Sequence, residues 1–154
     1  MTPTETSLKN FKSDVDQWMA ENVPKNPGFL LPLTFLEVGT EQQLDFLRDW
    51  QHKLWSAGFL GMHWPTQYGG QGSDAAYQGV VDKALTAHNA PIIFNTIGLN
   101  WTGPLLLDVG TEEDRQRYIK NILTGDEIWC QGFSEPDHGS DLGNVQTKAV
   151  RDGD

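Results

Sequence analysis

The chain has 154 residues, 38% of them hydrophobic, which is enough for a domain with its own core. Its formal net charge is −10, with 21 acidic and 11 basic residues, and the basic residues are scattered, which argues against binding to nucleic acid or to an anionic membrane surface. Cys130 is the single cysteine, so an intrachain disulfide and a thiolate zinc cluster are excluded and a reducing compartment is expected.

The first two predicted helices combine helical spacing of apolar residues with clear boundaries. The first covers residues 4–22 and ends before Pro24, and its apolar face comprises Leu8, Phe11, Val15, Trp18 and Met19. Residues 24–39 contain several prolines and glycines and show neither periodicity, which predicts an extended linker. Thr40, followed three residues later by Gln43, forms a capping box that opens a second helix ending near Gly58.

Three more helices are predicted further along the chain. Ser73 is a good N-cap for the third, which runs to about residue 85. Pro91 suits the first turn of a fourth helix that is apolar nearly all round, and is therefore expected to be buried, over residues 91–99. After Gly103-Pro104 and a short apolar stretch, Thr111 caps the last helix, whose acidic first turn complements the helix dipole and which ends at Gly125.

Past Glu127 the pattern changes from helical to β. Residues 128–134 and 144–151 predict two strands, the second with clear alternation. We therefore draw one domain boundary: a helical domain over residues 1–126, and the truncated beginning of a β domain over residues 127–154.

Two loops invite a functional interpretation. The glycine-rich stretch 69–72 has the spacing of neither phosphate-binding motif and is interpreted as a tight connection. The polar loop after the first predicted strand contains Ser134, Gly139 and Ser140, which offer two hydroxyls and a close approach to the backbone. Such a loop can hold a polar ligand, although its composition alone favours a surface turn. No metal ligands are assigned, because the four histidines lack the i, i+4 spacing of a helical zinc site.

Three blocks, in order, closely resemble the acyl-CoA dehydrogenase family. They are Trp64-Pro65 with Tyr68-Gly69-Gly70-Gln71-Gly72, then Gly110-Thr111-Glu112-Glu113 with Tyr118-Ile119 and Thr124-Gly125-Asp126-Glu127, then Trp129-Cys130-Gln131-Gly132-Phe133-Ser134-Glu135-Pro136 with Gly139-Ser140-Asp141. The last block is similar to the family's flavin-binding signature. The resemblance implies a mainly α fold: the N-terminal helical domain of this family followed by the first strands of its β-barrel-like middle domain, in a protein that also has a C-terminal four-helix domain.

The resemblance also implies roles for individual residues around FAD. Gln131 would lie beside the flavin ring, Phe133 would contribute backbone contacts to it, and Ser134 would place its hydroxyl near the reactive face. Gly139 and Ser140 would approach the diphosphate or the pantetheine of the substrate, so Ser140 is also a candidate substrate-binding residue. Two positions depart from the family pattern: Gln131 stands where an aromatic residue is frequent, and His138 where a small one is.

On the same grounds, the apolar stretch 91–99 would pack next to the acyl chain. Phe94 and Leu99 are the candidate substrate-binding residues there, with Ile97 and Trp101 nearby. For each residue taken singly, a purely structural role in the core is at least as frequent. Both interpretations stay open at this point.

The implied activity is α,β-dehydrogenation of an acyl-CoA thioester to the trans-2-enoyl-CoA. No catalytic residue is assigned in this chain, because the family's base is a Glu of the C-terminal helical domain. Glu135 adjoins the flavin signature but is expected on the opposite face of its strand from Ser134. The chain alone is therefore expected to be inactive.

The implied partners are the acyl-CoA substrate, an electron-transferring flavoprotein, and further subunits in a homo- or hetero-oligomer, either a dimer or a tetramer. A cytoplasmic location and the absence of a membrane span are expected, since no signal-peptide pattern or long apolar run is present. Three alternatives remain: a non-catalytic subunit of a heteromeric enzyme, a flavin monooxygenase or nitroalkane-oxidising relative on the same scaffold, and a free-standing binding module. Retention of Ser134, Gly139 and Ser140 argues against the first, and a lone pair of strands against the last.

Overall fold

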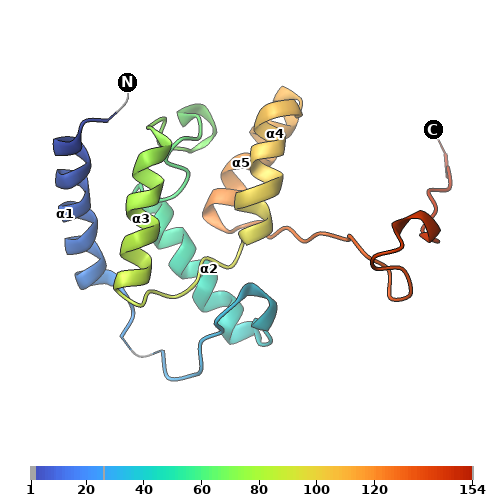
Figure 1. Ribbon diagram of the computed structural model, residues 1–154, viewed down its shortest axis with the longest axis horizontal. Helices are drawn as coiled ribbons and strands as arrows, with labels where there is room; N and C mark the ends of the chain where they lie inside the picture. The colour runs from blue at the N-terminus through green and yellow to red at the C-terminus, as the bar shows by residue number, and fades with distance from the viewer. Residues whose placement is uncertain (1–2, 26, 154) are drawn as a thin grey trace.

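The computed structural model describes residues 3–25 and 27–153. These residues form five α-helices and four short helical turns, and none of them lies in a strand. The elements are α1 (Glu5–Asn22), η1 (Phe35–Glu37), α2 (Glu41–Ser56), η2 (Thr66–Tyr68), α3 (Ala75–Ala87), the π-helix η3 (Gly98–Thr102), α4 (Gly103–Val109), α5 (Glu112–Thr124) and η4 (Leu142–Asn144). The mainly helical fold class is confirmed, and Figure 1 shows a helical body from which the C-terminal segment leads away.

Side-chain caps fix the beginnings of the helices. The hydroxyls of Thr4 and Thr40 accept hydrogen bonds from the third amide of α1 and α2, and Thr111 forms a full capping box with Asp114 at the start of α5. These three starts were predicted from sequence, but the capping box predicted at Thr40 is only half formed, because the Gln43 side chain accepts from the Gly39 amide instead of the Thr40 amide. At α3 the prediction of Ser73 was wrong, because the N-cap is Asp74, whose carboxylate accepts from the Ala76 amide at 2.9 Å.

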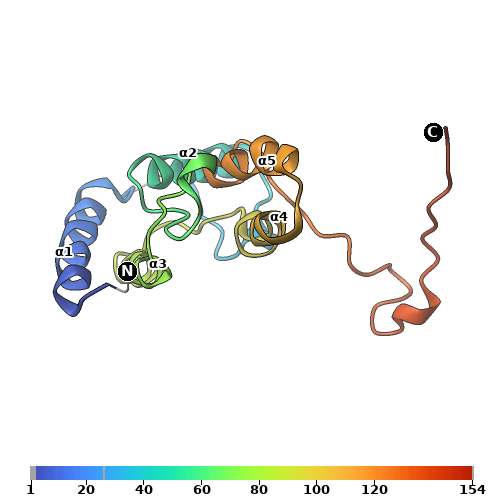
Figure 2. The ribbon, with the colours of Figure 1, turned by 90° about the horizontal axis from the view of Figure 1, so that it is seen from above.

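The core lies where three helix pairs meet. Helix α1 packs on α3, α2 on α5, and α4 on α5, and Figures 1 and 2 both place α1 beside α3. Each long helix contributes one buried stripe, as its 3.6-residue spacing requires. The buried residues of these stripes are Val15 and Met19 on α1, Leu47, Trp50 and Leu54 on α2, Val81 and Ala84 on α3, and Ile119, Ile122 and Leu123 on α5.

The predicted fourth helix was wrong in its bounds. Residues 91–95 are not helical; the Trp50 indole N–H donates to the Pro91 carbonyl at 3.0 Å and holds this stretch against α2. Helical structure begins at Thr96 and continues through η3 into α4 without a break at Gly103-Pro104. The Gly103 amide bonds to the Gly98 carbonyl, five residues back, so the register shifts directly before Pro104, which has no N–H to donate.

Gly103 shows why a helix can pass here. A Cβ at this position would lie 2.2 Å from the Cη2 atom of Trp64, which is itself buried. Only glycine therefore allows the backbone at the junction of η3 and α4 to pass so close to the Trp64 ring. The sequence motif Gly103-Pro104 looks like a helix stop, but it is a packing point inside a longer helical stretch.

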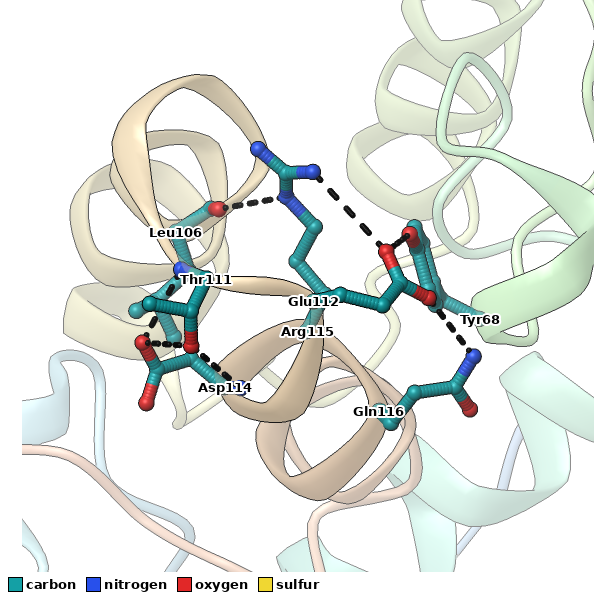
Figure 3. A network of polar contacts seen from close by, with 7 residues as sticks. All are labelled: Tyr68, Leu106, Thr111, Glu112, Asp114, Arg115 and Gln116. Carbon is teal, nitrogen blue, oxygen red and sulfur yellow. Dashed lines mark hydrogen bonds and ion pairs between the residues drawn. The ribbon is translucent and has the colours of Figure 1, made fainter.

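A polar network joins η2, α4 and the start of α5 (Figure 3). The Tyr68 hydroxyl donates to the Glu112 carboxylate at 2.6 Å, and Gln116 donates to the other oxygen at 3.0 Å. These bonds, the Tyr68 bond first, hold the pKa of Glu112 below its ordinary value. The Arg115 Nε atom donates to the Leu106 carbonyl at 3.1 Å, which ties α5 to the helix before it.

The two strands predicted at 128–134 and 144–151 are not formed. In the described part of this region, an isolated bridge between Glu135 and His138 is the only β pairing. A short strand is stable only when neighbours satisfy its backbone groups, and these two segments do not pair with each other. The domain boundary proposed between residues 126 and 127 remains a prediction. Within the described residues, no helix is both long and apolar enough to cross a membrane.

Candidate functional site

A cavity of about 650 Å³ opens between the helical body and the segment that leaves it. Three stretches that are distant in sequence form its walls. They are residues 35–44, from η1 into α2; residues 94–101, from the irregular stretch into η3; and residues 128–131 of the exit segment. Its lining is mainly apolar and aromatic, with Glu41 the one charged side chain among the lining residues that the structure describes.

Asn95 holds two of these walls together. Its side chain is fully buried, and its Nδ2 donates to the carbonyls of Ile122 at 3.0 Å and of Glu127 at 2.9 Å. Its Oδ1 accepts from the Trp129 amide at 3.1 Å. The Asn95 side chain is fully buried, so leaving its polar atoms unpaired would cost free energy, and its bonds fix the exit segment at residues 127–129.

Contacts from α5 reinforce this anchor. The rings of Trp129 and Tyr118 pack edge to face with centroids 5.4 Å apart. Arg117 forms an ion pair with Glu127, and its guanidinium lies 4.9 Å from the centre of the Tyr118 ring. The chain is therefore held in place up to the point where the candidate flavin-binding residues begin.

The linker between α1 and α2 supplies the opposite wall of the cavity. The Gln43 side chain bridges two linker positions: it accepts from the Gly39 amide at 3.0 Å and donates to the Leu30 carbonyl at 2.8 Å. The Leu33 amide donates to the Glu37 carboxylate at 2.8 Å. These bonds place η1, with Phe35 and Leu36, over the mouth of the cavity.

The structure brings two of the predicted site residues together at this cavity. Phe94 and Gln131 both line it, as do Ile97 and Trp101. Leu99 does not: it lines a separate, smaller cavity of about 280 Å³ together with Trp64 and Ile93. The division follows from local geometry: residues 97 and 101 lie one helical turn apart and face the same cavity as Phe94, which precedes the helical stretch, whereas residue 99 points to another side.

The other candidate residues lie beyond the cavity, in the segment that leaves the body (Figures 1 and 2). Phe133, Ser134, Gly139 and Ser140 are all exposed, with Phe133 69% accessible. A Cβ placed at Gly139 would have no atom within 4 Å, so the backbone there is open to approach by a ligand. Among the described residues, neither serine hydroxyl has a hydrogen-bond partner.

Sequence reasoning missed the residue that builds the site, Asn95. One signal was available: a carboxamide inside an otherwise apolar run is costly to bury unless it is fully bonded. The wall at Phe35 and Leu36 was also missed. The linker has no periodicity, and its position depends on Gln43, which lies in the next helix.

The chain is similar to known proteins along nearly its whole length. Residues 9–126 match the family model for the acyl-CoA dehydrogenase N-terminal domain. The acyl-CoA dehydrogenase IpdE1 of Mycolicibacterium smegmatis is 36% identical over 148 residues, which are 96% of this chain and 37% of that protein. The acyl-CoA dehydrogenase FadE26 of Mycobacterium tuberculosis is 40% identical over 97 residues, 63% of this chain and 24% of that protein.

Solved structures agree with these sequence relatives. The Tcur3481-Tcur3483 steroid ACAD matches with a TM-score of 0.74 at 31% identity, covering 99% of this chain and 38% of that one. The ChsE4-ChsE5 complex from Mycobacterium tuberculosis matches with a TM-score of 0.72 at 25% identity, covering the whole of this chain and 36% of that one.

The fold thus defines an N-terminal helical domain of the acyl-CoA dehydrogenase type. The chain belongs to the acyl-CoA dehydrogenase family. The matched residues of this chain span 37% of the length of IpdE1.

Proposed function

We propose that this chain forms the N-terminal part of an FAD-dependent acyl-CoA dehydrogenase, and that the 650 Å³ cavity holds the acyl group of the substrate. One observation carries the proposal: the exit segment lines the cavity with residues 128–131 and continues directly into the candidate flavin-binding residues. A ligand in the cavity would therefore lie next to a cofactor held by that segment. Mostly apolar walls with few polar groups suit an acyl chain.

The residues present fit a flavin cofactor. Gln131 offers a carboxamide at the edge of the cavity, while Phe133 and Ser134 follow it in an extended segment with free backbone groups. Around Gly139 the backbone is open, and Ser140 has an exposed hydroxyl, which suits contact with a phosphate. We assign Gln131, Phe133 and Ser134 to the ring system, and Gly139 and Ser140 to the diphosphate or to the pantetheine of the substrate.

Bound FAD would supply the hydride acceptor for α,β-dehydrogenation of the thioester. The residues of this chain bind and orient. Phe94, Ile97 and Trp101 would exclude water from the acyl group, and the Ser134 hydroxyl would donate a hydrogen bond to the flavin ring near its reactive face. The base that removes the α proton is not assigned in this chain, and the electron-transferring flavoprotein remains the proposed acceptor.

The substrate that we propose has a bulky, apolar acyl group. The cavity is broad, and aromatic rings from several segments line it: Phe35, Phe94, Trp101 and Trp129. One of the matching structures is a steroid ACAD, and a fused-ring acyl group would fill such a space better than a thin chain. Leu99 would act on this pocket only indirectly, because it lies on the other side of η3.

A second candidate function is a subunit of a heteromeric acyl-CoA dehydrogenase. One matching structure is a complex of two proteins, ChsE4 and ChsE5. In such a protein this chain would complete an interface while another chain supplies the base. The assembly would be a dimer or tetramer in either case.

Flavin binding tests the proposal. The 154-residue chain and the reading frame that contains it, expressed to its stop codon, would be incubated with excess FAD and desalted. We expect a stoichiometric flavin absorption band in the longer protein, and bleaching of that band by a steroid-derived acyl-CoA more readily than by a short straight-chain one.

Substitution of Phe94 by alanine gives the matched test of the acyl pocket. It should raise the KM for the bulky acyl-CoA about tenfold or more by removing a large apolar contact, whereas the same change at Leu99 should not. Absence of flavin from both proteins would refute the dehydrogenase assignment for this chain and leave the subunit hypothesis.

A further inference from the structure

Glu135 makes an unusual set of contacts for a partly exposed glutamate. Its Oε2 accepts from the Gln146 amide at 2.8 Å, and its Oε1 accepts from the Thr147 amide at 2.5 Å and from the Thr147 hydroxyl. Three donors from one short stretch thus converge on a single carboxylate. Donors of this kind favour the ionised form, and the pKa of Glu135 is held below its ordinary value, chiefly by the Thr147 hydroxyl.

These bonds close a loop. The partners are 11 and 12 residues apart in sequence, so the carboxylate joins the two ends of the segment 135–147. Inside the loop, the His138 amide donates to the Glu135 carbonyl at 3.1 Å, and η4 fills the second half. Compact loops with adjoining ends are frequent carriers of functional residues.

The closed loop contains Gly139 and Ser140, and Ser134 lies directly before it. We propose that Glu135 is a positioning residue whose carboxylate, by binding Gln146 and Thr147, fixes Ser134 relative to Gly139 and Ser140. The proposal rests on the proposed function, because it assigns these three residues to the cofactor and substrate. In this proposal, the relative positions of the three residues are determined by contacts within this chain.

The same contacts exclude Glu135 from proton transfer. A carboxylate that already accepts three hydrogen bonds from Gln146 and Thr147 is a poor base, since its low pKa opposes protonation. Asp137 offers the comparison: it is exposed in the same loop and, among the described residues, its carboxylate accepts no hydrogen bond. Substitution of Asp137 therefore removes a negative charge from the loop without affecting its closure, whereas substitution of Glu135 removes both.

The pH dependence of the closure has a definite sign. Because the pKa of Glu135 is lower in the folded chain, closure is complete above the ordinary glutamate pKa of about 4.3 and is lost as pH falls through the lower folded value. NMR spectroscopy of the 154-residue chain would follow the Gln146 and Thr147 amides from pH 6 downward. Both should titrate with a midpoint below the ordinary pKa of a glutamate.

Three variants make this measurement decisive. Glu135→Gln should abolish the titration of the Gln146 and Thr147 amides, and Asp137→Asn should leave it unchanged. Thr147→Val removes only the hydroxyl that contributes most to the low pKa, so the midpoint should rise toward the ordinary value. If the two amides of Glu135→Gln titrate as in the unmodified chain, the Glu135 carboxylate does not close the loop, whether or not the chain binds flavin.

The role in positioning is tested in the flavin-binding form of the protein. At pH 7, Glu135→Gln should weaken flavin binding about tenfold, because the loop loses bonds to an ionised group, and Asp137→Asn should have no such effect. Far-UV circular dichroism would verify that the helical body is intact in each variant. If the amides titrate as expected but flavin binds equally well to Glu135→Gln, Glu135 does not position the site. If the unmodified protein binds no flavin, the proposed function fails, while the NMR result still shows whether the Glu135 carboxylate closes the loop.

Discussion

A single buried carboxamide determines where the chain leaves the helical body. Asn95 is the hydrogen-bond partner of the Glu127 carbonyl and of the Trp129 amide, and it shares the Ile122 carbonyl with Gln51. Residues flanking it, Phe94 and Ile97, line the cavity, so the same residue that anchors the exit segment also sets the cavity wall. Gly98 allows this arrangement, because a Cβ there would lie 2.5 Å from the Asn95 Oδ1 atom.

Asn95→Ala should therefore destabilise the protein strongly. Loss of the side chain leaves the partly buried Glu127 carbonyl and Trp129 amide unpaired and empties a fully buried position, so we expect a decrease of about 2–4 kcal/mol in the free energy of unfolding. Denaturant unfolding followed by circular dichroism measures it. Asn100→Ala is the matched control, because Asn100 is exposed and its side chain forms no hydrogen bond with the described residues.

Hydrogen exchange at the Trp129 amide adds a local readout for the same variant. This amide donates to Asn95 Oδ1, so its exchange should become faster in Asn95→Ala and stay unchanged in Asn100→Ala. Equal stability of the two variants, within about 0.5 kcal/mol, would contradict the anchoring role.

At the scale of elements, the cap at Thr111 is the clearest link between sequence and structure. The Thr111 hydroxyl accepts from the Asp114 amide at 3.1 Å, while the Asp114 carboxylate accepts from the Thr111 amide at 3.0 Å. Thr111→Ala should lower the free energy of unfolding by about 1 kcal/mol, whereas Thr111→Ser should keep most of it. Thermal unfolding of both variants makes the measurement; a serine variant as unstable as the alanine one would show that the hydroxyl is not the cause.

The difference between local caps and contacts from distant segments explains how much of the fold could be predicted. Helices α1, α2 and α5 begin at local caps, so a few neighbouring residues determine their starts. The stretch 91–102 could not be read in this way, since Trp50 binds Pro91 and Trp64 packs on Gly103 from distant segments. The strands at 128–134 and 144–151 failed for a related reason: their propensity is real, but pairing partners are required to express it.

Prediction of the candidate site was partial for physical reasons. The motif around residues 131–140 is local in sequence and could be found there, and Phe94 and Gln131 both line the cavity. The wall at Phe35 and the anchor at Asn95 arise from tertiary contacts between segments without a pattern of their own. The apolar run predicts one common surface for Leu99 and Phe94, whereas in the structure the two residues line different cavities.

For the whole molecule, the important division is between the parts of the chain that are buried and the parts that extend. From residue 132 to residue 153, no described residue is buried, whereas Trp129 packs on Tyr118 and bonds to Asn95. The stabilising contacts thus continue three residues past the boundary that composition suggests. The contacts that stabilise the body and the loop that we propose to bind flavin consequently lie in different segments.

Two truncations test this division. A chain ending at residue 131 should unfold with the same free energy as the 154-residue chain, within about 0.5 kcal/mol, because none of the described residues that are removed is buried. A chain ending at residue 126 loses the Trp129 ring contact and leaves the Asn95 Oδ1 atom unpaired, so it should be less stable by about 1–3 kcal/mol. Denaturant unfolding of the three chains gives the comparison. Equal stability of the two truncations would place the end of the folded body at residue 126, and a large loss in the 131-residue chain would mean that the extended segment supports the body.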